Sequence, residues 1–167
     1  MRGLLLVFYG DGKGKTTAAI GLAVRSIGHG MYVLFVQFIK RDLQVGEYRI
    51  LKSLNSIRHV ALGPGLGASR EEVVECTRRG IELVSREWRN YDIIILDELG
   101  VAISKYEYPL EDVIQLVENI RSGGRHVVIT GKYMPRELID IADLVTEFRC
   151  VKHYYSQLRG PVPGLDL

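Results

Sequence analysis

Short runs of consecutive apolar residues recur along the chain, and each run ends in glycine or polar residues. Valine, isoleucine and leucine dominate these runs, which lie at residues 4–9, 31–39, 56–62, 91–98, 125–130 and 143–148. A strand that is apolar on both faces is typical of a parallel sheet covered by helices. The pattern therefore predicts the strands of an open, mostly parallel sheet.

Helical periodicity fills three of the intervals between these runs. Residues 15–28 are rich in small residues, which suit close packing against a sheet. Ser69 and Glu72 have the S-x-x-E spacing of a capping box, which predicts a helix from there to about Trp88. Pro109 precedes a third helical pattern, which a serine–glycine–glycine sequence ends. Strands that alternate with helices predict βαβ units and an α/β fold.

The bulk composition limits the classes of protein that fit. With 167 residues, 47% of them hydrophobic and 25% charged, the chain matches one soluble domain that spans residues 1–167. A net charge of +2 argues against a surface that binds nucleic acid through its phosphates. The first apolar run is too short to cross a membrane, and a charged loop follows it instead of a cleavage site. We therefore expect a cytoplasmic protein that binds neither nucleic acid nor membrane.

A glycine- and lysine-rich loop follows the first apolar run and leads into the first helical pattern. Its sequence from Gly10 to Thr17 is GDGKGKTT. A loop between a strand and a helix N-terminus points backbone N–H groups at one spot, where the helix dipole also favours an anion. Glycines let the backbone approach phosphate oxygens, and a lysine adds a cation. The loop therefore predicts a binding site for the phosphates of a nucleotide.

Individual residues of this loop have expected roles. Lys15 is the expected cation for the terminal phosphates, Lys13 is a second candidate, and the Thr16 hydroxyl is placed to bind Mg²⁺. The common spacing G-x-x-x-x-G-K-[ST] would need glycine at position 9, but Tyr9 stands there and Gly10 comes one residue later. The shift raises the question of whether this loop serves ATP hydrolysis or a different reaction of the same nucleotide.

Asp97 and Glu98 end the apolar run at residues 91–98 and complement the loop. At the carboxyl end of a buried strand, one carboxylate would hold the Mg²⁺ shell and its neighbour could take part in chemistry. Two reaction classes remain open on these residues. In a hydrolase or kinase, Glu98 would polarise the water or hydroxyl that attacks the γ-phosphorus. In the other class, the loop would hold triphosphate as a leaving group while a nucleophile attacks the ribose.

The least regular part of the chain is the segment 40–68. It contains a glycine-rich loop after an expected strand, with the sequence GPGLGA from Gly63 to Ala68. Loops at the ends of parallel strands are where α/β proteins usually bind ligands, so this loop is a candidate substrate contact. A plain connection between two elements is an equally weighted alternative.

The chain contains, in this order, the segments GDGKGKTTAAIGLAVRSIGHG, VLFVQFIK, IIILDEL, VVITGKYMPRELIDIADLVTEFRCVKHYY and PGLDL. Together they resemble the ATP:corrinoid adenosyltransferases of cobalamin synthesis and salvage, in the bacterial P-loop class. The resemblance spans essentially the whole chain and implies a single-domain, RecA-like P-loop fold and a homodimer. It also implies transfer of the 5′-deoxyadenosyl group from ATP to the cobalt of a Co(I) corrinoid, with release of triphosphate. An electron-donor protein would supply the reduced cobalt.

The resemblance also assigns roles to residues at matching positions. ATP would contact Gly10, Asp11, Gly12, Lys13, Gly14, Lys15, Thr16, Thr17 and Arg25. Mg²⁺, or Mn²⁺ in its place, would be bound by Thr16 and Glu98, with Asp97 beside them. The corrinoid substrate would contact Gln37, Lys40, Gly65, Leu66, Ala68 and Lys132. Because Co(I) is a strong nucleophile that needs no general base, catalysis depends on positioning and on stabilising the leaving triphosphate, for which Lys15 and Glu98 are the expected catalytic residues.

A few positions depart from the family pattern. Asp11 replaces the asparagine of the sequence GNGKGKTT. Lys132 replaces the arginine of the sequence TGR, which keeps the charge but loses a bidentate fork. Leu66 and Ala68 stand where relatives have an aromatic pair that displaces the lower ligand of the corrinoid and eases reduction of the cobalt. We therefore expect this loop to displace the lower ligand of the corrinoid less effectively.

Overall fold

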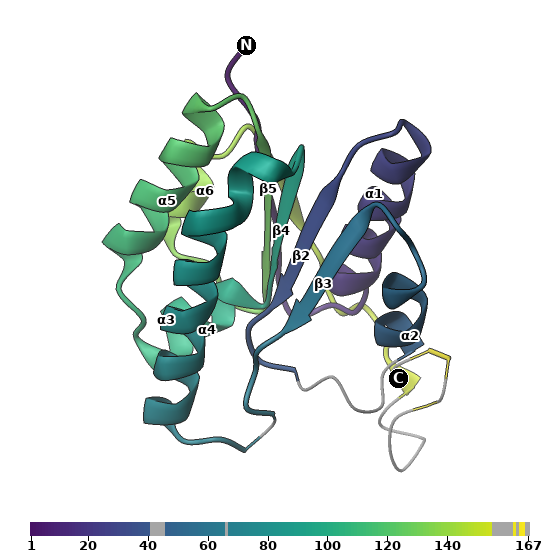
Figure 1. Cartoon of the computed structure of the whole chain (residues 1–167). Helices are drawn as coiled ribbons and strands as arrows, with labels where there is room; N and C mark the ends of the chain where they lie inside the picture. The colour runs from purple at the N-terminus through teal and green to yellow at the C-terminus, as the bar shows by residue number, and fades with distance from the viewer. Residues whose placement is uncertain (41–45, 66, 155–161, 163, 166–167) are drawn as a thin grey trace.

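The computed structural model describes residues 1–40, 46–65, 67–154, 162 and 164–165. Its centre is a sheet of six parallel strands (Figure 1). The strands are β1 (Leu5–Tyr9), β2 (Val33–Gln37), β3 (Ile57–Ala61), β4 (Ile93–Asp97), β5 (His126–Gly131) and β6 (Leu144–Glu147). They lie in the order β3-β2-β4-β5-β1-β6, and every neighbouring pair is parallel. The mostly parallel sheet expected from the apolar runs is confirmed.

Burial of the strands depends on their place in the sheet. All five residues of β2 and all five of β4, which are interior strands, are buried. All four residues of the edge strand β6 are exposed, and its Leu144 and Val145 are 46% and 40% exposed. An apolar run therefore predicted a strand correctly in both places, but only β2 and β4 are buried along their whole length.

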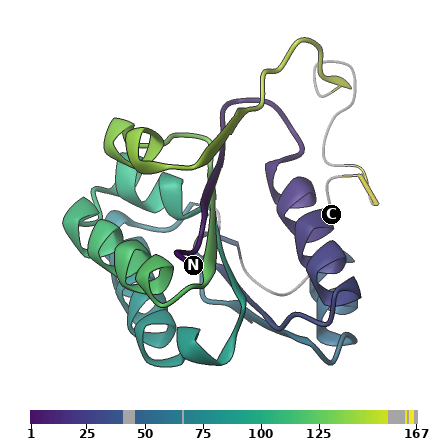
Figure 2. The same cartoon turned by 90° about the horizontal axis from the view of Figure 1, so that it is seen from above.

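Helices cover both faces of the sheet and make a three-layer arrangement (Figure 2). One face carries α1 (Lys15–Gly28) and α2 (Gly46–Lys52). The other carries α3 (Arg70–Glu87), the short 3-10 helix η1 (Trp88–Asn90), α4 (Leu99–Tyr106), α5 (Leu110–Ser122) and α6 (Arg136–Ile141). None of the helices in the described ranges combines the length and the apolar character needed to cross a membrane.

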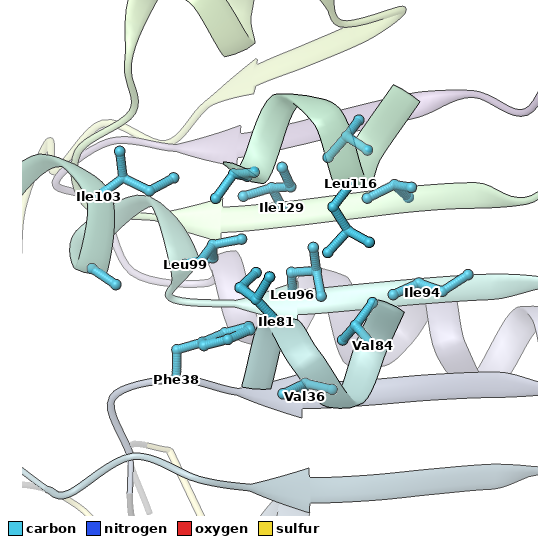
Figure 3. Packing of buried hydrophobic residues seen from close by; sticks show 14 of the residues in the cluster. Val36, Phe38, Ile81, Val84, Ile94, Leu96, Leu99, Ile103, Leu116 and Ile129 are labelled. Atoms are coloured by element: carbon cyan, nitrogen blue, oxygen red, sulfur yellow. The ribbon is translucent and has the colours of Figure 1, made fainter. Parts of the chain in front are cut away.

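The buried residues form one apolar cluster on each face of the sheet. Successive residues of a strand point to opposite faces, so Leu34 and Val36 of β2 join the cluster beneath α3 to α6, whereas Phe35 packs beneath α1. Figure 3 shows residues of the first cluster, among them Ile81, Val84, Leu96, Leu99, Leu116 and Ile129. Because both faces are covered in this way, the carboxyl edge of the sheet is left for ligand binding.

Three helices agree with the sequence analysis. α1 has the expected bounds, and α5 begins after Pro109 as expected. Ahead of α3, the Glu72 N–H donates to Ser69 Oγ at 3.2 Å and the Ser69 N–H donates to Glu72 Oε2 at 2.9 Å, which confirms the capping box. Three further helices, α2, α4 and α6, were not predicted, and α2 lies inside the segment that was expected to be irregular. These helices have six to eight residues, too few for a periodicity to stand out, and α4 and α6 have no side-chain N-cap.

Candidate functional site

A pocket of about 390 Å³ lies where the phosphate loop meets the carboxyl edge of the sheet. Many residues expected to bind nucleotide, metal or corrinoid line it: Lys13, Gly14, Lys15, Thr16, Thr17, Lys40 and Glu98. Ile20, Gly46, Glu47, Gly164 and Leu165 complete the lining. Residues from separate parts of the sequence thus converge on one concave site.

The phosphate loop joins β1 to α1 through two glycines in the left-handed region of backbone space. Gly10 has φ 114° and Gly14 has φ 111°, values that residues with a side chain rarely adopt. Because α1 begins at Lys15, the N–H groups of its first turn have no acceptor within the helix and are available to an anion. The Lys15 ammonium donates to the Gly12 carbonyl at 2.6 Å. Burial lowers the pKa of Lys15, and the carboxylates of Glu98 and Asp11 offset only part of that effect.

Residues 148–150, which we call the loop brace, follow β6 and lie against the phosphate loop (Figure 2). The Phe148 N–H donates to the Tyr9 carbonyl at 2.7 Å, and the Phe148 carbonyl accepts from the Gly12 N–H at 2.8 Å. The Cys150 N–H donates to Asp11 Oδ1 at 3.2 Å, so the Asp11 side chain contacts the brace. This contact was not predictable from the sequence, because it joins two segments far apart in the chain.

The loop brace explains where the glycines of the phosphate loop stand. A Cβ atom on Gly10 would overlap the backbone carbonyl of Phe148, and one on Gly12 would come within 2.7 Å of the Arg149 carbonyl carbon. Tyr9, in contrast, is the last residue of β1 and is still paired with a strand on each side. Glycine is therefore needed at position 10, where the chain leaves the strand and meets the brace, and a side chain is tolerated at position 9.

Asp97 is fully buried at the end of β4, and its carboxylate accepts hydrogen bonds from three side chains. The hydroxyl of Thr16 donates at 3.0 Å, the hydroxyl of Thr130 at 2.6 Å and the amide of Gln37 at 3.1 Å. The strand order brings Gln37 and Thr130 to Asp97, because β2 and β5 flank β4, and the first turn of α1 supplies Thr16. Asp97 therefore orients the Thr16 hydroxyl, whose oxygen lone pairs remain for a ligand in the pocket.

Glu98 lines the pocket directly and has a backbone conformation unusual for a residue with a side chain, with φ 63° and ψ 14°. Burial and the neighbouring Asp97 carboxylate raise the pKa of Glu98 to about 7. Its buried Oε2 atom has no hydrogen-bond partner within the described part of the chain. A buried carboxylate oxygen without a partner, in a pocket that a threonine hydroxyl also lines, fits a hard divalent cation.

Thr16 and Glu98 are thus the residues suited to bind Mg²⁺, and Asp97 would act through Thr16. No three His, Cys, Asp or Glu side chains form a metal cage in the residues that the structure covers. Mg²⁺ in proteins is commonly held by one or two carboxylates together with substrate phosphates and water. The site therefore fits a cation that shares its shell with a nucleotide.

Lys40 gives the pocket a further cation. Its Nζ lies 3.5 Å from a carboxylate oxygen of Glu47. Burial on its own would lower the pKa of Lys40, but the carboxylates of Asp97, Glu98 and Glu47 outweigh it, and the pKa is raised. Lys40 is therefore protonated at neutral pH, and with Lys13 and Lys15 it makes the pocket suitable for a polyphosphate.

Several other expected site residues lie outside this pocket. Arg25 is exposed in the last turn of α1, at the opposite end of the helix from the phosphate loop. Gln37 is fully buried, with its amide bonded to Asp97. Lys132 lines a separate hollow beside Tyr133. The structure therefore does not bring these three residues to the nucleotide pocket directly.

The described residues of the glycine-rich loop after β3 do not line this pocket either. The Gly65 N–H donates to the Ile39 carbonyl at 3.1 Å, and the half-buried Ala68 packs against the cluster beneath α3. A hollow of about 380 Å³ beside this loop is lined in part by Pro64 and Cys76. Leu66 lies outside the described residues, so its expected contact with the corrinoid stays a prediction.

Comparison with known proteins identifies relatives across nearly the full chain. A family model described as ATP:corrinoid adenosyltransferase BtuR/CobO/CobP matches residues 1–166. The corrinoid adenosyltransferase CobA of Salmonella typhimurium is 38% identical over 171 residues, which cover 99% of this chain and 86% of that protein. The corrinoid adenosyltransferase of Pseudomonas aeruginosa is 32% identical over 165 residues, which cover 93% of this chain and 79% of that protein.

A solved structure shares the fold. The flagellar accessory protein FlaH from Methanocaldococcus jannaschii superimposes with a TM-score of 0.61 over 87% of this chain and 71% of its own, at 17% identity. At that identity the likeness concerns the fold alone, and it confirms the expected RecA-like α/β fold. The sequence relatives add the family. The chain belongs to the ATP:corrinoid adenosyltransferase family of enzymes.

Proposed function

We propose that the protein transfers the 5′-deoxyadenosyl group of ATP to the cobalt of a Co(I) corrinoid and releases triphosphate. The observation that carries the proposal is the convergence of three lysines, a helix N-terminus and Glu98 on one pocket, in a chain of this family. A leaving group with several negative charges needs stabilisation of this kind. The corrinoid enters as the second substrate.

The proposed reaction is a substitution at the ribose. An electron pair of Co(I) forms a bond to C5′, the bond between C5′ and the phosphate oxygen breaks, and its electron pair leaves with the triphosphate. No proton has to be removed from the nucleophile, so the protein needs no general base. Lys13, Lys15 and Lys40 would neutralise the charge that develops on the leaving oxygens, and the first turn of α1 would hold the phosphates in place.

We propose Mg²⁺ as the companion ion of the nucleotide, with Thr16 and Glu98 as its protein ligands. When bound, the ion would neutralise part of the charge on the triphosphate. Asp97 would fix the Thr16 hydroxyl through its 3.0 Å hydrogen bond. The unpartnered Oε2 of Glu98 is the observation that supports an ion at this position.

A second candidate function is hydrolysis of ATP, or transfer of its γ-phosphate to a small substrate. One observation favours it: burial and Asp97 raise the pKa of Glu98 to about 7, a value that suits a general base for water. In that case, the same lysines would stabilise the phosphoryl group that is transferred.

One incubation separates the candidates. The protein is mixed with MgATP and chemically reduced cobalamin, and the products are identified by chromatography and absorbance. Triphosphate together with a light-sensitive alkyl-cobalt spectrum supports adenosyl transfer. ADP and phosphate formed without any need for the corrinoid support the second candidate. ATP binding without any product would contradict adenosyl transfer and ATP hydrolysis and point to a nucleotide-binding protein without turnover.

We further propose that the enzyme works as a homodimer and receives electrons from a protein donor. Both ideas rest on membership of the family and on the need for cobalt in the Co(I) state before transfer. Sedimentation of the purified protein tests the first. The second is tested by replacing the chemical reductant with a reduced flavoprotein and measuring the rate of adenosylation.

A further inference from the structure

Thr130 carries a buried hydroxyl near the end of β5, where it follows three apolar residues. It occupies β5 one residue before the strand ends, and it is 0% exposed. The preceding residues Val127, Val128 and Ile129 are also fully buried. Because a hydroxyl in such surroundings needs partners, its hydrogen bonds indicate why a threonine is suited to this position.

The Thr130 hydroxyl bonds to both acidic residues of the site. It donates to Asp97 Oδ1 at 2.6 Å and accepts from the backbone N–H of Glu98 at 2.9 Å. A hydroxyl has one proton to donate and can accept at the same time, so a single side chain serves both contacts. Valine, which has the same shape, could make neither.

The hydrogen bond to Glu98 is made by a residue whose backbone is in the left-handed region. Glu98 adopts φ 63° and ψ 14°, between the last residue of β4 and the first residue of α4. Residues other than glycine stay in this region only where the surroundings hold them there. The hydrogen bond from the Glu98 N–H to the Thr130 hydroxyl is one such restraint. With the backbone in this conformation, Glu98 lines the pocket.

The hydrogen bond to Asp97 links Thr130 to Thr16, which lines the pocket. Asp97 Oδ1 accepts from both threonine hydroxyls, from Thr130 at 2.6 Å and from Thr16 at 3.0 Å. Thr130 therefore restrains the acceptor that orients Thr16. This one hydroxyl is therefore connected to both residues proposed above to hold the cation: to Thr16 through the Asp97 carboxylate and to Glu98 through its backbone N–H.

We propose that Thr130 is a positioning residue, which fixes the Asp97 carboxylate and the Glu98 backbone and thereby sets the geometry of the cation site formed by Thr16 and Glu98. It would not touch the cation or the substrate. The inference deepens the proposed function and rests on its assignment of Thr16 and Glu98 to a nucleotide-bound cation. Groups that orient metal ligands in this way affect metal affinity about 10–100-fold when they are removed.

The test compares Thr130→Val with Thr130→Ser. Affinity for ATP is measured by calorimetry with saturating Mg²⁺ and again with EDTA, and Mn²⁺ binding in the presence of ATP is followed by electron paramagnetic resonance. With Mg²⁺, the affinity of T130V for ATP should be about 10–100-fold lower than that of the wild type, whereas its affinity without metal should be unchanged. T130S keeps the hydroxyl and should restore most of the metal-dependent affinity.

A matched control is Thr77→Val. Thr77 is also fully buried, and its hydroxyl donates to the Val73 carbonyl at 2.7 Å within α3, away from the pocket. T77V removes a buried hydroxyl of the same kind and should leave both ATP affinities unchanged. If T130V does not fold, as judged by circular dichroism, Thr130→Ala takes its place, because it removes the hydroxyl without a branched side chain.

A second measurement addresses the backbone contact alone. The Glu98 amide should exchange its hydrogen faster in T130V than in the wild type and in T130S, because it has lost its acceptor. The proposal is overturned if T130V keeps its metal-dependent affinity, if T130S is as weak as T130V, or if affinity falls equally with and without metal. These measurements need only ATP and a metal, so a wild-type protein that binds MgATP but adenosylates no corrinoid would refute the proposed reaction without deciding the role of Thr130.

Discussion

The phosphate loop and the glycine-rich loop after β3 are both glycine-rich connections at the carboxyl edge of one sheet, yet they are constrained very differently. The phosphate loop is held by hydrogen bonds between the loop brace and three residues, Tyr9, Asp11 and Gly12. The loop after β3 has a backbone bond from Gly65 to Ile39 and the apolar packing of Ala68. The comparison indicates that the proposed position of the triphosphate would depend on contacts across the fold, whereas the proposed corrinoid contact would depend more on which side chains the loop after β3 carries.

The largest effect is expected from Lys15→Ala on the phosphate-loop side. The leaving triphosphate would lose its principal cation, and removing one such electrostatic partner typically lowers the rate about 100–1000-fold. The rate of adenosylcobalamin formation at saturating ATP and reduced cobalamin measures the loss. Lys52→Ala, at an exposed lysine in the last turn of α2, is the control and should change little. A K15A enzyme with nearly wild-type turnover would refute the role given to Lys15.

Gly10→Ala tests the loop brace. The added Cβ would overlap the Phe148 carbonyl, and the backbone at φ 114° is strained for alanine. We expect the free energy of unfolding to fall by about 1–3 kcal/mol, with weaker ATP binding, because the loop and the brace must separate. Urea unfolding and calorimetry with MgATP measure the two effects.

The matched control for this change is Gly21→Ala in α1. A Cβ at Gly21 meets nothing within 4 Å, and the position lies inside a helix. Alanine there should stabilise the protein by about 0.5–1 kcal/mol. If G10A were as stable as G21A and bound ATP normally, close contact with the brace would not be the reason for glycine at position 10.

The sequence allowed much of the phosphate side to be predicted, because strand, glycine loop and helix follow one another within a few residues. The capping box at Ser69 and Glu72 was equally local, and it was confirmed. The different environments of Asp97 and Glu98 were not predictable, since Asp97 is enclosed by Thr16, Gln37 and Thr130 from three other elements. The loop brace was missed for the same reason. Gln37 was expected to contact the corrinoid. In the structure its side-chain amide donates to Asp97 of the neighbouring strand β4, and this hydrogen bond explains why a polar residue stands in β2.

A smaller effect is expected at the glycine-rich loop after β3, from the double change Leu66→Phe and Ala68→Trp. An aromatic pair at these positions would displace the lower ligand of the corrinoid more effectively. Adenosylation should become several-fold faster when a protein reductant supplies the electrons, with little gain when a strong chemical reductant does. Equal gains with both reductants would show that the change does not act through reduction of the cobalt. Because Ala68 packs against the cluster beneath α3, thermal unfolding of the variant is measured alongside.

The smallest effect is expected from Asp11→Asn, which separates the hydrogen bond of Asp11 from its charge. The contact with the brace uses Oδ1 as an acceptor from the Cys150 N–H, and an asparagine side chain has an oxygen at the same place. D11N should therefore match the wild type in unfolding and in KM for ATP, whereas Asp11→Ala should cost about 1 kcal/mol of stability because the N–H loses its partner. The charge itself has a minor role, as it raises the pKa of Lys15 against the larger opposite effect of burial. If D11N bound ATP as poorly as D11A, the charge and not the hydrogen bond would be the property that this position supplies.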